Sequence, residues 1–244
     1  MTTDEVNAEI IEFWNQRAVQ EQAERYMPAV YPPFNGEALL CVGFNPSMPQ
    51  NRPGFIEKHF PELQYPAFFE WSNRDDFVHQ MWNADQPGTT LQIEQCAKEG
   101  YSFYKKFGAI AQELHTRWDH VDLFFCREVN QRGLQSRIFD NVRNQELNDF
   151  GNQQLKLAME LVVDARPRMI LVANAEAARI FERAFKLDFD SEHCCYQGNI
   201  GRRNVPVFLS SMLTGSRALD NFSYRTLRCL MKKEWNRRYF GYAH

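Results

Sequence analysis

The hydrophobic pattern of the chain alternates between short apolar runs and longer stretches with helical spacing. Apolar residues recur at steps of three or four along the segments for which we predict helices: 5–26, 101–117, 144–165, 175–185 and 219–236. Continuous apolar runs predict buried strands over 38–42, 121–126, 169–173 and 205–209. Strands that alternate with helices predict the α/β class, in a three-layer αβα arrangement around a mostly parallel central sheet.

The organisation along the chain favours a single domain over residues 1–244. No linker, internal repeat or low-complexity tract interrupts the sequence. Residues 1–35 are expected to form an N-terminal helix followed by an extended, proline-containing segment. Residues 46–66 hold five prolines and predict a long ordered loop, which in compact domains is usually functional. Pro206 predicts that the fourth strand lies at a sheet edge or begins near this residue.

Composition places the chain among ordinary globular proteins. Hydrophobic residues make up 44% and charged residues 24% of the 244 residues. No apolar run approaches the roughly 20 residues that span a bilayer. The acidic start over 1–5 lacks the basic and apolar parts of a signal peptide. We therefore expect a cytoplasmic monomer that has no membrane segment and needs no cofactor.

The six cysteines give no metal-binding spacing. None forms a C-x-x-C pair, which excludes zinc-ribbon and iron–sulfur patterns. Four lie in apolar surroundings, where a free thiol behaves as a small hydrophobe: Cys41, Cys96, Cys126 and Cys229. His193 beside Cys194 and Cys195 suggests a metal site, but such sites need three or four donors. We expect neither a metal ion nor an iron–sulfur cluster.

Charge is distributed unevenly along the chain, although the net charge is only −3. Residues 1–100 carry 15 acidic and 6 basic residues, a net charge of −9, and residues 195–244 carry 9 basic and 2 acidic residues, a net charge of +7. This asymmetry favours one basic face that binds nucleic acid. A solvated C-terminal helix explains the same charges equally well.

The candidate ligand site lies in the loops that follow the predicted strands, because ligands of parallel sheets bind at the carboxyl ends of strands. These loops cover 43–60, 126–132 and 210–217. In the first loop, Gly43 removes a side chain at the turn, Asn45 projects an amide and Pro46 stiffens the backbone. A fixed amide can position a water or bind a polar ring edge. A purely structural turn accounts for the same residues.

The segment Leu40-Cys41-Val42-Gly43-Phe44-Asn45-Pro46-Ser47 resembles the first motif of the uracil-DNA glycosylase superfamily. It is most similar to the G-x-N-P-G form of the mismatch-specific and single-strand-selective branches. The resemblance implies that Asn45 holds the water that attacks the sugar carbon. It also implies a base pocket to which the rest of the motif contributes: Gly43, Phe44, Pro46 and Ser47.

A second segment, Leu209-Ser210-Ser211-Met212-Leu213, is similar to the H-P-S-P-L or N-P-S-G-L motif of the same family. The resemblance implies that Ser211 contacts a phosphate and that Leu213 wedges into the duplex when a base is flipped. Ser210 and Arg217 are the further DNA contacts expected in this loop. In layout the resemblance covers roughly 36–235, including a similar third strand and turn over 170–175.

The chain departs from the family pattern at several positions. Leu209 replaces the His or Asn that stabilises charge on the departing base, and Ser47 replaces the second glycine of the first motif. The base-reading Asn at the end of the second strand has no clear match, and four residues are candidates: Cys126, Arg127, Glu128 and Asn130. Arg127 and Glu128 either contact a base edge, for which Arg127 is our choice, or pair with each other.

A stacking aromatic is expected about ten residues beyond the first motif. Phe55 is the nearest candidate and Phe60 the next. In a chain with 20 Phe residues, packing in the core is the alternative for both. The aromatic-rich region 65–82 has the same two explanations, a stacking platform or a part of the core.

Three hypotheses of function follow. The first is a DNA glycosylase-like hydrolase that excises a deaminated or damaged base flipped from single- or double-stranded DNA. The second is a catalytically silent module of the same fold that binds a nucleobase or nucleic acid, and Leu209 favours it over the first. The third is an unrelated small-molecule α/β enzyme, against which the basic C-terminal segment argues.

Overall fold

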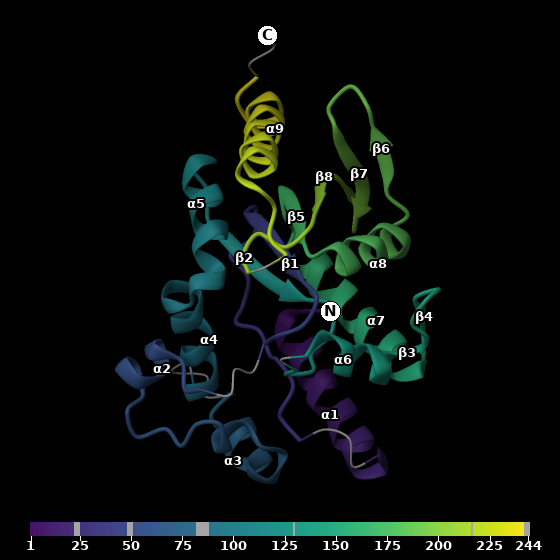
Figure 1. Cartoon of the computed structure of the whole chain (residues 1–244). Coiled ribbons are helices and arrows are strands. Elements are labelled where there is room, and N and C mark those ends of the chain that lie inside the picture. The colour runs from purple at the N-terminus through teal and green to yellow at the C-terminus, as the bar shows by residue number, and fades with distance from the viewer. Residues whose placement is uncertain (22–24, 48–50, 82–87, 129, 216, 242–244) are drawn as a thin grey trace. The chain divides into compact units, whose positions relative to one another are not determined.

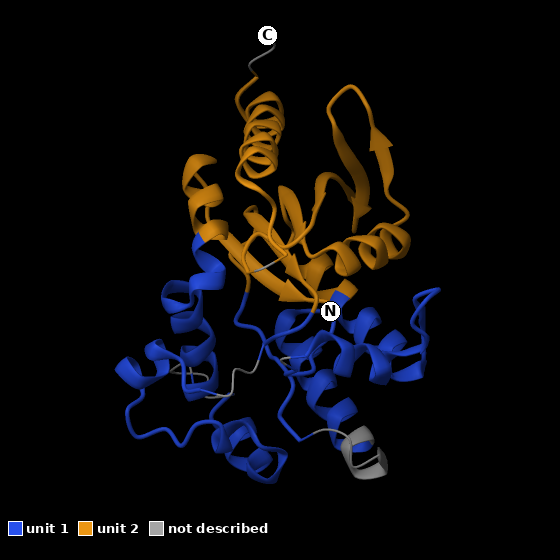
Figure 2. Ribbon diagram, in the orientation of Figure 1, with its two compact units in different colours: residues 1–33, 45–105, 124–158 blue, residues 34–44, 106–123, 159–244 orange. Residues whose placement is uncertain are grey.

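The computed structural model describes residues 1–21, 25–47, 51–81, 88–128, 130–215 and 217–241 (Figure 1). These residues form two compact units, each assembled from separate segments of the chain (Figure 2). Unit 1 comprises residues 1–33, 45–105 and 124–158, and unit 2 comprises residues 34–44, 106–123 and 159–244. Each unit has its own elements and is described by itself.

Unit 2 contains a six-stranded sheet in the order β2-β1-β5-β8-β7-β6. Four strands are parallel: β1 (Leu39–Gly43), β2 (Trp118–Asp122), β5 (Met169–Ala173) and β8 (Arg203–Ser210). β7 (Cys195–Ile200) pairs antiparallel with β8, and β6 (Asp188–Asp190) pairs antiparallel with β7. Helices of this unit are α5 (Lys105–Glu113, from Lys106 on), α8 (Ala175–Phe185) and α9 (Asn221–Phe240). The expected α/β class with a mostly parallel central sheet is confirmed.

The central strands are the most apolar ones. Every residue of β1 and β5 is buried, and β5 and α8 have the predicted bounds. The second predicted strand exists, but its predicted bounds of 121–126 are wrong, because β2 begins three residues earlier and ends at Asp122. Among the described residues β2 pairs with β1 alone, and that pairing stops where Gly43 meets Asp122. The buried residues 123–126 continue beyond the sheet without strand pairing.

The antiparallel edge of the sheet was not predicted. β6 and β7 form a hairpin that adds two strands beside β8. Pro206 is therefore not at a sheet edge, since it lies opposite Gln197 of β7. On its other side, pairing with β5 begins one residue later, at Val207, so the missing N–H of Pro206 falls before that ladder.

Unit 1 is mostly helical. Its helices are α1 (Thr3–Glu21), α2 (Gly54–His59), α3 (Arg74–His79), α4 (Thr89–Gly100), α6 (Gln131–Ile138) and the first part of α7 (Asp149–Asp164). Short 3₁₀ turns cover Ala67–Phe69, Trp71–Asn73 and Ser102–Tyr104, and a small hairpin pairs β3 (Phe139–Asn141) with β4 (Glu146–Leu147). The region predicted as a loop over 46–66 thus contains α2. The predicted helices over 101–117 and 144–165 begin later than expected, at Lys105 and Asp149.

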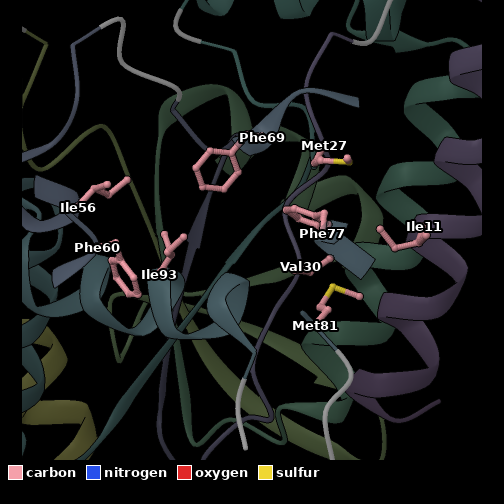
Figure 3. Close-up of a cluster of buried hydrophobic side chains, with 9 residues drawn as sticks. All are labelled: Ile11, Met27, Val30, Ile56, Phe60, Phe69, Phe77, Met81 and Ile93. Atoms are coloured by element: carbon pink, nitrogen blue, oxygen red, sulfur yellow. The ribbon is translucent and has the colours of Figure 1, made fainter. Parts of the chain in front are cut away.

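The aromatic-rich region 65–82 contributes to the hydrophobic core of unit 1. Figure 3 shows its buried cluster, drawn from α1, the extended segment after it and α2 to α4: Ile11, Met27, Val30, Ile56, Phe60, Phe69, Phe77, Met81 and Ile93. Tyr65, Phe68 and Trp71 pack against this cluster while partly exposed. Of the two explanations for this region, the structure supports core packing for its described residues.

The structure bears on three expectations, those for the cysteines, for metal binding and for membrane-spanning helices. Cys41, Cys126 and Cys195 are buried, whereas Cys229 is exposed on α9, so the apolar surroundings predicted for Cys229 are wrong. No group of three or more potential metal-ligating side chains occurs among the residues that the structure describes. Over the same residues, no helix combines the length and hydropathy needed to cross a membrane.

Candidate functional site

The two motif-bearing strands, β1 and β8, end at the same edge of the sheet. Both are parallel to β5, which lies between them. In the register, Val42 lies beside Val172 and Ser210 lies beside Ala173. The last residues of the two strands, Gly43 and Ser210, are therefore at the same edge of the sheet. This is the edge at which parallel sheets bind ligands, as the positions of the motifs predicted.

A neighbouring carboxylate leaves no room for a side chain at Gly43. A Cβ on Gly43 would lie 2.1 Å from Oδ1 of Asp122 and 3.0 Å from Nε2 of His120. The Gly43 carbonyl accepts a hydrogen bond of 3.1 Å from the N–H of Leu123. The glycine therefore allows close side-chain approach at the end of β1.

A buried His–Asp pair beside Gly43 was missed in the sequence. His120 Nε2 lies 3.6 Å from Asp122 Oδ1, and each side chain is 6% exposed. The ring of Phe107 on α5 stacks on His120 at 6.2 Å between centroids. The signal was present, because two polar residues two positions apart in a strand share a face.

Asn45, the first residue of the motif in unit 1, is held through its amide nitrogen. Nδ2 donates hydrogen bonds to the carbonyls of Glu128 at 2.8 Å and Cys126 at 3.2 Å, and contacts that of Pro46 at 3.1 Å. The N–H of Glu128 in turn donates to the Pro46 carbonyl at 3.2 Å. Three carbonyl acceptors fix which end of the amide is nitrogen. Oδ1 is then left as an acceptor with no partner among the described residues.

The remaining residues of the first motif differ in exposure. Phe44 is 4% exposed, Pro46 is half-buried and Ser47 is exposed. Phe44 is thus a packing residue in this structure, whereas Pro46 and Ser47 present surface next to Asn45 along the chain.

Arg127, expected to bind a base, is engaged inside unit 1. Its side chain is 6% exposed, its guanidinium lies 2.6 Å from Glu94, and it stacks over Phe69 at 4.6 Å. Its Nε has no hydrogen-bond partner among the described residues. Burial raises the pKa of the neighbouring Tyr65 to about 12, an effect that the Arg127 charge opposes. The expected pairing of Arg127 with Glu128 is absent among the described contacts, since Glu128 faces Arg137 at 3.7 Å.

The candidate stacking aromatics pack against protein. Phe55 on α2 meets Tyr101 edge-on at 6.4 Å between ring centroids. It also approaches Gly100 closely, because a Cβ there would lie 2.6 Å from Cβ of Phe55. Phe60 is 8% exposed within the core cluster. The structure supports core packing for both.

The loop after β8 is anchored rather than projecting. Leu213 is 1% exposed, and its carbonyl accepts a hydrogen bond from Nζ of Lys106 on α5. The Ser210 hydroxyl donates to the Ser211 carbonyl at 3.0 Å. Leu213 could enter a duplex only if this loop moved, so the structure does not support a ready wedge. Ser210, Ser211 and half-buried Leu209 line the accessible part of the strand end.

The basic C-terminal segment does not form one face. Arg203 begins β8, at the opposite edge of the sheet from Ser210, and pairs with Glu37. Arg228 pairs with Glu113, and Arg237 and Arg238 pair with Glu234. Arg217 is exposed and has no ion-pair partner among the described residues. Only part of the +7 charge is therefore available to a ligand.

A cavity of about 510 Å³ in unit 1 has none of the predicted site residues in its lining. It is lined by Phe13 and Phe150 together with Glu9, Glu12 and Asp149. Three carboxylates disfavour a polyanionic ligand there.

Comparisons with known proteins leave the family open. The chain matches no family model, and no curated protein matches its sequence.

Proposed function

We propose that the chain is a DNA glycosylase-like hydrolase that uses Asn45 to position water against the sugar of a flipped, deaminated or damaged base. The observation that supports it is the orientation of Asn45. Its Nδ2 donates hydrogen bonds to backbone carbonyls, so its Oδ1 remains as a hydrogen-bond acceptor for a ligand or water. The resemblance of Gly43–Ser47 to the first glycosylase motif supplies the reaction class.

An oriented amide oxygen suits this chemistry. Hydrolysis of a base–sugar bond builds positive charge on the sugar, and the attacking water must be aligned with it. Oδ1 of Asn45 can accept a hydrogen bond from that water and hold it in place. An amide does not titrate near neutrality, so the alignment needs no shifted pKa. The departing base also needs a hydrogen-bond donor, which commonly contributes several kcal/mol. The Leu209 side chain has none, and we therefore expect slow turnover on bases that leave easily.

The first prediction concerns Asn45→Ala. Purified wild-type protein should release uracil, hypoxanthine or xanthine slowly from oligonucleotides, and Asn45→Ala should lower that rate by about 100-fold or more, because the water loses its alignment. Release is measured on single- and double-stranded substrates. Asn73→Ala is the matched control, since the Asn73 amide also donates to a backbone carbonyl, that of Ala67, at 2.7 Å in unit 1.

Leu209→His tests the same proposal from the other direction. If the geometry is glycosylase-like, a restored donor should raise the rate of base release. The melting temperature of each variant shows whether the fold is retained. If neither the wild type nor Leu209→His released a base from any substrate, this result would contradict the proposed hydrolase activity.

A silent nucleobase- or nucleic-acid-binding module is the second candidate. Two observations favour it: Leu209 offers no side-chain donor, and Leu213 is buried. It predicts that oligonucleotides bind but are recovered intact.

A further inference from the structure

We propose that the exposed face of α9, headed by Phe222, is a binding surface for single-stranded nucleic acid. The surface, here called the α9 stripe, consists of Phe222, Arg225, Thr226, Cys229, Lys232 and Lys233. It shares no residue with the loop of Asn45, and the inference stands whether or not Asn45 supports base excision.

The α9 stripe lies along one side of the helix. With 3.6 residues per turn, its members recur at steps of three and four and are all exposed. The buried residues of α9, Met231, Glu234 and Trp235, fall on the other side. Figure 1 shows α9 as the long yellow helix that follows the loop after β8.

The cations of the stripe are available. The other arginines of α9 are neutralised within unit 2, by Glu113 or by Glu234. Arg225, Lys232 and Lys233 have no ion-pair partner among the described residues, and the stripe contains no acid. Asp220 at the helix start is occupied, because its carboxylate accepts from the N–H groups of Phe222 and Ser223. Positive charge on this face is therefore uncompensated.

Phe222 adds an exposed aromatic ring for which the described part of the chain provides no ring contact. It is 78% exposed, the largest value for a large hydrophobic residue among those described. It lies in the first turn of α9, two residues beyond the N-cap Asp220 and just after the loop that continues from Ser210. The Tyr239 hydroxyl at the other end of α9 donates to the Arg168 carbonyl, which precedes β5. Phe222 is therefore at the end of α9 nearer the carboxyl edge of the sheet.

A ring at the end of a row of cations fits single-stranded nucleic acid better than a membrane. Bases stack on exposed aromatic rings whatever the sequence, while cations follow the backbone phosphates. Seven residues separate Arg225 from Lys232, about 10 Å along a helix. A membrane-binding helix needs a continuous apolar stripe, and this face holds one large apolar ring.

The test is the affinity of the full chain for a labelled single-stranded oligothymidine, measured by fluorescence anisotropy at several salt concentrations. Reversal of Arg225, Lys232 and Lys233 to Glu should lower the affinity at least 100-fold and flatten its salt dependence, because phosphate contacts release counterions. Phe222→Ala should lower the affinity about 10-fold and leave the salt dependence unchanged.

The matched control reverses three exposed cations elsewhere, Lys58, Lys156 and Arg202, to Glu. It makes the same change in net charge and should lower the affinity less than 3-fold. An equal loss in the control, or no binding by the wild type at low salt, would overturn the inference. So would binding of phosphatidylserine vesicles that Phe222→Ala abolishes while oligothymidine does not bind.

Discussion

At the scale of single residues, the structural role of Gly43 is the most sharply defined. Gly43→Ala places a methyl group 2.1 Å from the Asp122 carboxylate, so the buried Asp122 side chain or one of the two strands must shift. We expect a loss of about 1–3 kcal/mol in the free energy of unfolding, typical of overpacking. Urea denaturation measures it.

Gly54→Ala is the control for this substitution. Gly54 is the first residue of α2, and a Cβ there meets nothing within 4 Å. The free energy of unfolding of Gly54→Ala should equal that of the wild type or be slightly higher. If Gly43→Ala proves equally harmless, then Asp122 does not constrain β1.

Substitution of Leu213 distinguishes a role of its side chain in core packing from a role as a wedge in duplex DNA. Since its side chain is buried, Leu213→Ala should lower the free energy of unfolding by about 2–5 kcal/mol, as cavity-forming substitutions do. Thermal and urea unfolding measure the change. Normal stability together with lost binding to duplex DNA would instead show that Leu213 leaves its site and acts as a wedge.

At the scale of elements, α9 contacts β8 through Arg238, which pairs with a buried carboxylate of the same helix. Glu234 is 2% exposed, and Arg238 joins it at 2.5 Å while also donating to the carbonyl of Asn204. Burial alone would raise the pKa of Glu234, but Arg237 and Arg238 more than offset this and lower it. The lowered pKa means that the ionised carboxylate stabilises the fold.

Glu234→Gln should therefore cost about 1–3 kcal/mol at neutral pH, the value of hydrogen bonds to charged groups. The stabilisation is fully present above the unfolded pKa of Glu, about 4.3, and is lost as the pH falls through the lower folded value. Melting temperatures of wild type and variant should thus converge at acid pH. Glu62→Gln, at an exposed position, should match the wild type at every pH, and parallel curves for Glu234→Gln would refute the linkage.

Element prediction succeeded where burial was complete and failed where polar residues were buried. The all-apolar run of β5 gave its bounds, as did the strong amphipathic pattern of α8. β2 contains Asp119, His120 and Asp122, all buried, so its apolar content pointed to residues beyond its end. The hairpin of β6 and β7 carries no continuous apolar run, since long-range pairing with β8 determines it.

At the scale of the whole molecule, the candidate site shows the same limit. Gly43 and Asn45 could be identified from the sequence, because a glycine and an Asn-Pro pair after an apolar run are typical of the turn that ends a strand. The acceptors of the Asn45 amide could not be predicted, since they are backbone carbonyls 81 and 83 positions later in the chain. The packing of Phe55 and the burial of Leu213 likewise depend on residues distant in sequence, α4 in one case and Lys106 in the other.

The position of β5 between β1 and β8 has a consequence for synthesis on the ribosome. When a nascent chain has emerged as far as β5, the sheet of unit 2 can hold only β2, β1 and β5. The wholly apolar β5 is then an open edge with unpaired N–H and C=O groups. It stays open until β8 follows, 30 residues after β5 ends. Folding of the sheet must therefore wait until β8 has emerged, and any product that stops before Arg203 presents a surface suited to chaperones or to aggregation.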